Sequence, residues 1–270
     1  MDNGSINGSY ETVRSIVEKM RGSMKVKLIK LKRNLGFCEG NNVAYRAKDP
    51  ESKYVVLLNN DTIPYPDSLK RLIAFAEAHH DIGAVQGVMV RMSDNKVDTA
   101  GGLITEMLTA HLIFSGEISV PTRKPFYITY ADGAYAVYKV DAIKKAVGRS
   151  DKLFESLMFA YYDDLPLGLK LWNAGLKCIT LPFITGKHER SSTFKRIRDL
   201  QLFLMVRGLV VLNEVSNSRY KHLIRAFCLR RCFSNCSHSL LRLKNPFPSS
   251  MLGQVLTRKR ALLVVWLRES

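Results

Sequence analysis

This sequence of 270 residues is short of three things: long apolar runs, cysteines and acidic residues. No apolar run reaches the ~20 residues that a membrane-spanning helix needs. The N-terminus is polar and shows no secretory signal, so we expect a cytoplasmic protein. The five cysteines are an odd number in a long chain, which argues against a disulfide scaffold and for a reducing compartment.

The shortage of acidic residues gives the chain a strong positive charge. Aspartate and glutamate total 24 against 41 lysines and arginines, for a net charge of +17. This charge predicts an anionic partner: nucleic acid, an acidic membrane leaflet or a phosphorylated substrate. The basic residues are widely spread and concentrate after Arg190 without a nucleic-acid-binding motif, so we expect no nucleic-acid partner.

The most informative stretch is an apolar run, Tyr54 to Leu58, that ends in Asn59, Asn60 and Asp61. Such a run predicts a strand buried on both faces. Ligands bind beyond the carboxyl ends of the strands in a parallel α/β sheet, which is where these polar side chains would lie. Asp61 is a hard oxygen ligand suited to Mg²⁺ or Mn²⁺. A simple Asx turn after a strand remains the alternative.

The surrounding chain alternates expected strands with expected helices. We expect strands near residues 26–31, 54–58, 83–91 and 177–181, and helices near 9–21, 41–47, 67–79 and 164–172. This rhythm favours an α/β fold with a mostly parallel, doubly wound sheet flanked by helices.

The composition changes beyond Arg196. We therefore predict an α/β domain over residues 1–195 and a helical, basic, amphipathic region over 196–270, including the apolar run Leu262 to Leu267. A basic amphipathic helix often lies on an anionic membrane, although these helices could instead pack on the sheet. Three cysteines recur every four residues: Cys228, Cys232 and Cys236. The simplest interpretation of this spacing is one packed face of a helix, because zinc sites usually have more closely spaced cysteine pairs.

Four motifs in order resemble the family 2 glycosyltransferases of the GT-A fold, especially those that extend polysaccharides or lipid-linked glycans. They are Asp2-Asn3-Gly4-Ser5; Asn34-Leu35-Gly36-Phe37 with Gly40-Asn41-Asn42; Leu58-Asn59-Asn60-Asp61-Thr62; and Tyr162-Asp163-Asp164 with Leu167 to Gly175. The resemblance covers roughly residues 1–193. Family members have a strand and a helix ahead of the first motif, so we expect a domain shortened at its N-terminus.

The resemblance implies a metal site at the end of the central strand. There Mg²⁺ or Mn²⁺ would bridge Asp61 and the diphosphate of a nucleotide-sugar, with Asn59 and His188 nearby. A metal neutralises the charge that the leaving diphosphate gains. Asn59 and Asn60 stand where relatives often have carboxylates, so metal affinity would depend on Asp61 and the diphosphate. A lone histidine such as His188 is otherwise usually structural.

The resemblance also implies a catalytic base, Asp164, with Asp163 in a supporting role. Asp164 would take the proton from the acceptor hydroxyl in a single displacement with inversion. A helix N-terminus stabilised by its acidic residues is the plainer explanation of this pair, and both can hold. Pro166 stands where relatives commonly have another aspartate.

The remaining expected contacts are with the donor and the acceptor. The residues implied for the donor nucleotide are Asp2, Asn34, Gly36, Gly40, Asn41 and Asn60, and those for donor sugar or acceptor are Asp132, Gly133 and Trp172. Asp2 and Asp132 could also simply form turns.

The sequence thus predicts an enzyme that moves a sugar from a nucleotide-diphosphate-sugar to a hydroxyl of a glycan or lipid-linked acceptor. We expect it at the cytoplasmic face of the membrane as a peripheral protein. The alternative is a catalytically inactive, shortened relative that acts as a binding or regulatory protein.

Overall fold

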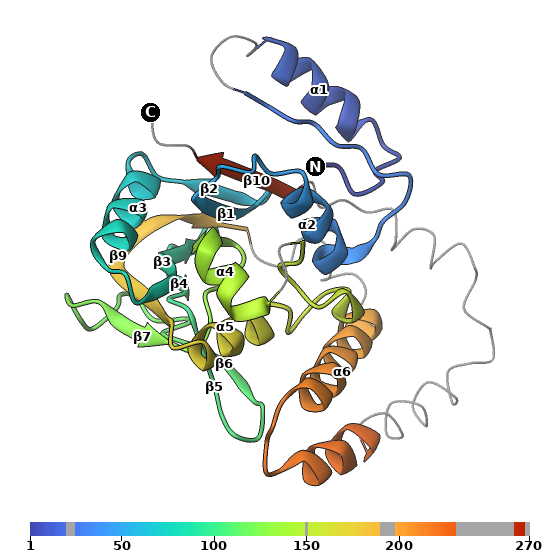
Figure 1. Cartoon of the computed structure of the whole chain (residues 1–270), viewed down its shortest axis with the longest axis vertical. Coiled ribbons are helices and arrows are strands. Elements are labelled where there is room, and N and C mark those ends of the chain that lie inside the picture. The colour runs from blue at the N-terminus through green and yellow to red at the C-terminus, as the bar shows by residue number, and fades with distance from the viewer. Residues whose placement is uncertain (20–24, 149–150, 190–197, 231–261, 268–270) are drawn as a thin grey trace.

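The computed structural model describes residues 1–19, 25–148, 151–189, 198–230 and 262–267. Its centre is a sheet of eight strands in the order β10-β1-β8-β3-β9-β2, with β4 on β3 and β7 on β9 (Figure 1). The strands are β1 (Tyr54–Asn59), β2 (Thr62–Pro64), β3 (Ile82–Arg91), β4 (Val97–Thr99), β7 (Phe126–Ile128), β8 (Tyr135–Lys139), β9 (Lys177–His188) and β10 (Leu262–Leu267). A separate hairpin joins β5 (Gly102–Ile104) to β6 (Ala110–Leu112).

The α/β class is confirmed, but the sheet is mixed where we expected it to be mostly parallel. Among the named strands only β3 and β9 pair in parallel. Strand β8 is antiparallel to both of its neighbours, β1 and β3. The stretch between β3 and β8 contains short strands and turns in place of a crossover helix. The chain therefore re-enters the sheet at the end where β3 finishes, and β8 runs antiparallel to β3.

The strand expected at residues 26–31 does not form. This stretch contributes a single bridge, between Lys30 and Asp2, and Val26 remains 40% exposed. Alternation of apolar and basic residues therefore produced an extended segment without a sheet neighbour along most of its length.

Helices cover both faces of the sheet, and the side chains of β1 alternate between two cores as a doubly buried strand requires. Val55 and Leu57 join the core formed with α2 (Gly36–Arg46), α4 (Val140–Val147), α5 (Asp164–Asn173) and α6 (Arg198–Val215). Val56 and Leu58 pack on the other face against α3 (Ser68–Ala78). A single 3₁₀ turn, η1 (Ser156–Met158), precedes α5.

Helix α1 (Ser9–Lys19) contributes nothing to either core. None of its residues is buried, and Figure 1 shows it outside the body of the sheet and its covering helices. Of the helices in the described ranges, none is long and apolar enough to cross a bilayer.

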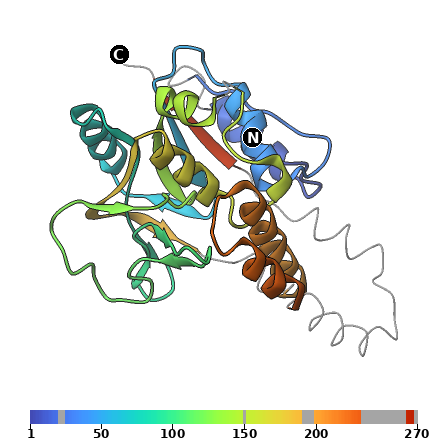
Figure 2. The ribbon, with the colours of Figure 1, turned by 60° about the horizontal axis from the view of Figure 1, so that its bottom comes forward.

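The C-terminal region is only partly helical, which corrects our expectation. Helix α6 and a helix over residues 221–230 lie against each other, joined by hydrogen bonds from Arg225 to Glu214 (Figure 2). Leu204, Leu212, Ile224 and Cys228 enter the main core. The apolar run Leu262–Leu267, however, forms β10, antiparallel on the edge of β1.

The burial of Cys228 is as expected for a packed helix face, whereas Cys232 and Cys236 lie outside the described residues. The predicted boundary between residues 195 and 196 stays a prediction, and side chains from beyond it belong to the same core as the sheet.

Candidate functional site

Asp61 and His188 meet at the end of the central strand. Asp61 lies in the turn between β1 and β2, and the ladder pairs Thr62 of β2 with His188 at the end of β9. The His188 Nε2 atom lies 3.2 Å from Asp61 Oδ1. The same ring faces a second carboxylate on its other side, since Nδ1 lies 2.8 Å from Oδ2 of Asp98 on β4. All three side chains are largely buried.

These carboxylates control the charge of the imidazole. Burial alone would lower the pKa of His188, but the hydrogen bonds with Asp61 and Asp98 outweigh burial and raise the pKa to about 9. In the metal-free protein at neutral pH the ring is therefore protonated and donates from both nitrogens, and Nε2 has to lose its proton before it can bind a cation. Asp98 was not among the residues that the sequence suggested, because no local pattern marks it and only the sheet brings it to His188.

The chain supplies part of a metal-ligand set at this point. A carboxylate and an amide oxygen are donors that suit Mg²⁺ or Mn²⁺, and an imidazole nitrogen lies beside the carboxylate. Asn59 Oδ1 is buried and has no hydrogen-bond partner among the described residues, which leaves it free for a ligand. Among the described residues, no group of three His, Cys, Asp or Glu side chains is arranged to hold a metal ion by itself. The residues thus fit a cation that takes further oxygens from a bound diphosphate.

Asp163 and Asp164 lie at the N-terminus of α5, as the sequence predicts. Asp164 Oδ2 accepts a hydrogen bond of 3.1 Å from the backbone N–H of Gly133. A Cβ on Gly133 would lie 2.9 Å from Asp164 Oδ1 and 3.2 Å from the ring of Phe37, so a larger residue here would force the Asp164 carboxylate to move. Asp163 is buried, whereas Asp164 is partly exposed. Asp164 is thus the more accessible residue of the pair, although its Oδ1 atom is buried.

The residues ahead of this acidic pair have an unusual backbone. Phe159, Tyr161 and Tyr162 have φ angles of 60°, 67° and 60°, the left-handed region that is costly for residues with bulky side chains. The Phe159 carbonyl accepts from the N–H of Phe37 at 2.6 Å, at the start of α2. This strained segment is thus tied to the helix that carries the second glycine motif.

Asp132 connects the two acidic centres. Its negative charge acts to raise the pKa of His188, and the charges of Asp132 and Asp164 both act on the buried Tyr138, whose pKa is raised mainly by burial. The turn alternative also holds, because Asp132 Oδ1 accepts from the N–H of Ala134 at 2.9 Å. Ala134 in turn accepts from the N–H of Asn59, at 3.0 Å, so the loop adjoins the end of β1.

The N-terminal loop and the start of α2 form a second group of predicted residues. Asn3 Nδ2 donates to Asn34 Oδ1 at 3.0 Å and to the Gly36 carbonyl at 2.9 Å. Asp2 is buried, and its Oδ1 accepts from the N–H of Ser5. Asn3 was absent from our predicted contacts, although the Asp-Asn-Gly-Ser motif contains it.

Helix α2 begins at Gly36, earlier than expected. Two of the predicted donor-site residues, Gly40 and Asn41, lie on its buried face. Gly36 has a φ of +81°, which favours glycine. A Cβ on Gly40 would come within 3.0 Å of Met1 Cε. Asn41 is fully buried and donates to the Phe37 carbonyl. Gly40 and Asn41 thus pack the helix, and a nucleotide contact by either stays a prediction, as it does for the exposed Asn60.

Trp172 is not brought together with the other candidates. It lies near the far end of α5 from Asp164, about 12 Å along the helix axis. Its indole N–H donates to the Ile128 carbonyl at 2.9 Å, and its ring meets that of Tyr127 edge to face.

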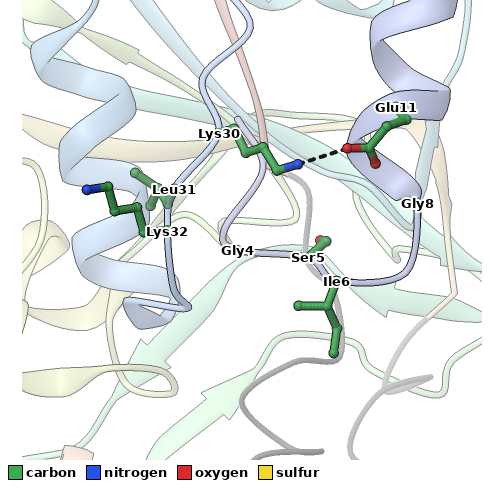
Figure 3. A pocket seen from close by; sticks show the side chains of 8 residues that line it. All are labelled: Gly4, Ser5, Ile6, Gly8, Glu11, Lys30, Leu31 and Lys32. Carbon is green, nitrogen blue, oxygen red and sulfur yellow. Dashed lines mark hydrogen bonds and ion pairs between the residues drawn. The ribbon is translucent and has the colours of Figure 1, made fainter.

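A basic pocket of about 510 Å³ lies between the N-terminal loop and the extended segment at residues 30–32 (Figure 3). Figure 3 shows Lys30 reaching across to Glu11, a contact of 2.8 Å, while Lys32 lines the wall. The pocket shares no lining residue with the acidic cluster. Asp2 is next to it through the bridge to Lys30.

Known proteins resemble this chain in sequence and in fold. A rice (Oryza sativa subsp. japonica) protein, glucomannan 4-beta-mannosyltransferase 1, is 26% identical in an alignment of 158 residues that covers 55% of this chain and 26% of that protein. A crystal structure of GalNAc-T7 with UDP, GalNAc and Mn²⁺ superposes with a TM-score of 0.53 at 11% identity, covering 68% of this chain and 35% of that one. The chain therefore spans about a quarter to a third of these proteins, and the structural likeness confirms the GT-A fold.

The model of one family, Glycosyl transferase family 2, matches residues 1–146. This match covers more than half of the chain and includes the first three of the four motifs and the loop at Asp132. The chain belongs to glycosyltransferase family 2.

Proposed function

We propose that this chain is an inverting glycosyltransferase that moves a sugar from a nucleotide-diphosphate-sugar to a hydroxyl of a glycan or lipid-linked acceptor. The observation that carries the proposal is that Asp61 meets His188 just beyond β1, that the charge of Asp132 acts on His188, and that Asp164 is hydrogen-bonded to Gly133 beside Asp132. We infer that the diphosphate lies at the Asp61–His188 pair and that Asp164 is the base.

Asp164 is the proposed base. Its carboxylate takes the proton of the acceptor hydroxyl while the hydroxyl oxygen forms a bond to the anomeric carbon of the donor sugar. The bond from that carbon to the diphosphate breaks on the opposite side, and its electron pair leaves with the diphosphate, so the configuration inverts. The Gly133 N–H keeps one carboxylate oxygen of Asp164 in position, and the buried Asp163 has a supporting role beside Asp164.

Asp61, His188 and Asn59 are the residues that would hold Mg²⁺ or Mn²⁺. When bound, this cation neutralises the charge that develops on the leaving diphosphate. The presence of UDP and Mn²⁺ in the GalNAc-T7 crystal supports a nucleoside diphosphate and a divalent cation here. The likeness to a glucomannan mannosyltransferase supports a polysaccharide acceptor.

The other predicted contacts follow from their places in the fold. We propose donor-nucleotide contacts at the N-terminal loop and the start of α2, through Asp2, Asn34, Gly36, Gly40 and Asn41, with Asn60 beside the diphosphate. Asp132 and Gly133 would contact the sugar or the acceptor, and Trp172 a more distant part of the acceptor.

The C-terminal helices are the proposed membrane contact, which would hold the protein peripherally at the cytoplasmic face. Large apolar side chains on these helices are exposed among basic ones: Phe203, Leu223 and Phe227 beside Arg225 and Arg230. The test is cosedimentation with lipid vesicles. The placement is supported if the wild type sediments with anionic but not with neutral vesicles, and if the double variant Leu223→Glu, Phe227→Glu sediments less with anionic vesicles. Equal sedimentation of both proteins would remove it.

The central test is sugar transfer with Mn²⁺ across a panel of nucleotide-sugars and glycan acceptors. We compare wild type, Asp164→Asn and Asp61→Asn with Asp141→Asn, whose carboxylate is 95% exposed on α4. Loss of a general base costs roughly 10²–10⁴-fold, so Asp164→Asn should lose at least that much turnover while Asp141→Asn keeps the wild-type rate. Equal rates in all four proteins would refute the residue assignments.

A further inference from the structure

We propose that Asp98 is a positioning residue for this reaction: its buried carboxylate holds the ring of His188 so that Nε2 points at Asp61 and the donor diphosphate. The proposal rests on the proposed function of the Asp61 site. It concerns a residue outside the four motifs, on a strand that the sequence did not suggest.

The geometry gives each ring nitrogen of His188 one carboxylate. Nδ1 to Asp98 Oδ2 is the shorter contact, at 2.8 Å, and Nε2 to Asp61 Oδ1 is the longer, at 3.2 Å. Nδ1–H donates to Asp98, so only Nε2 remains to face a ligand held by Asp61. The nitrogen that binds a metal is set by the hydrogen bond of the other nitrogen, and a carboxylate is a common partner for that purpose.

Both partners stand on backbone that is fixed by strand pairing. His188 is paired with Thr62 on one side and with Arg91 on the other. Asp98 lies on β4, which pairs with β3 and whose Val97 N–H donates to the Glu117 carbonyl at 2.8 Å. A site held on strands is more precise than one on loops, so this contact fixes the ring direction closely.

The burial of Asp98 argues that its charge acts on the imidazole. The residue is 1% exposed, and a carboxylate in such a place is costly unless it is paired. His188 is an ionisable partner in direct contact with it, at 2.8 Å. Substitution by asparagine would keep the shape but allow the amide to donate to Nδ1. The proton would then stay on Nε2, the nitrogen that must be free to bind a cation, as happens when the aspartate of a catalytic triad is replaced by asparagine.

The first measurement is the protonation pattern of His188 by ¹⁵N-detected correlation spectroscopy, in protein saturated with UDP and Mg²⁺. The wild type and the control Asp141→Asn should carry the ring proton on Nδ1 alone, whereas Asp98→Asn should show a mixture or the opposite tautomer. This spectroscopic difference would not arise if Asp98 only filled space.

The second measurement is the affinity for Mn²⁺ in the presence of UDP, followed by electron paramagnetic resonance. Loss of such a partner typically costs 10–100-fold, so Asp98→Asn should weaken Mn²⁺ by that factor, and it should cost nothing further when added to His188→Gln. An unchanged tautomer with unchanged Mn²⁺ affinity in Asp98→Asn would overturn the role of Asp98 alone. No Mn²⁺ binding by the wild type would instead overturn the proposed function and the metal-directed role with it.

If Asp98→Asn does not fold, the wild-type spectrum decides. A His188 ring that carries its proton on Nε2 in the UDP–Mg²⁺ complex would overturn the proposal, and a proton on Nδ1 would support it.

Discussion

The charge of His188 makes the stability of this protein depend on pH in a definite direction. In the metal-free protein its pKa is about 9, above the ordinary 6.5, because the hydrogen bonds to Asp61 and Asp98 outweigh the effect of burial. The folded state therefore binds the proton more tightly than the unfolded chain does. This stabilisation is fully present below pH 6.5 and is lost as the pH rises through 9.

The size of the effect follows from the same two values. Each pH unit between them is worth about 1.4 kcal/mol, so the contribution of His188 to the free energy of unfolding is about 3 kcal/mol. A change of that size is a large fraction of the stability of an ordinary domain, about 5–15 kcal/mol.

The assay is urea unfolding in EDTA at intervals from pH 6 to pH 10, for wild type and His188→Gln. Substitution should cost most at pH 6 and about 3 kcal/mol less at pH 10, because the wild type has by then lost the protonated ring. The buried thiols Cys38 and Cys178, whose pKa values burial raises, ionise alike in both proteins and cancel in the difference. A difference that stays constant over this range, or an NMR titration of His188 with a midpoint at or below 6.5, would refute the reasoning.

Three further predictions test the site and the sheet. Gly133→Ala brings a Cβ within 2.9 Å of Asp164 Oδ1, so kcat/KM should fall at least about 10-fold with a stability loss of about 1–3 kcal/mol; unaltered kcat/KM would contradict the close approach. Asn42→Ala leaves the N–H groups of residues 153 and 154 without their acceptor, and urea unfolding should show a loss of about 3 kcal/mol, against almost none for the exposed Asn173→Ala. Val265→Pro removes the N–H that β10 directs toward Val56 of β1, so hydrogen exchange should quicken in β1, and unchanged exchange there would argue against the pairing.

The elements that the sequence predicted well are those whose pattern is local. Three such elements are the apolar run of β1, the periodic helix α3 and the acidic start of α5. Each is specified by residues that are close together in the sequence. The order of the glycine, asparagine and aspartate motifs likewise indicated the family that the family model then matched.

What the sequence by itself determined was therefore the position of Asp61 at a strand end and of Asp164 at a helix start, together with the family. Only the tertiary structure decided that β8 runs antiparallel to β1 and that residues 262–267 form a strand beside β1. It also decided that residues 26–31 form a single bridge in place of a strand. It alone placed Asp98 against His188, 90 residues away in the chain. The physical reason is that a strand and a buried ion pair are both completed by a partner, and nothing in the local chain specifies which distant segment supplies it.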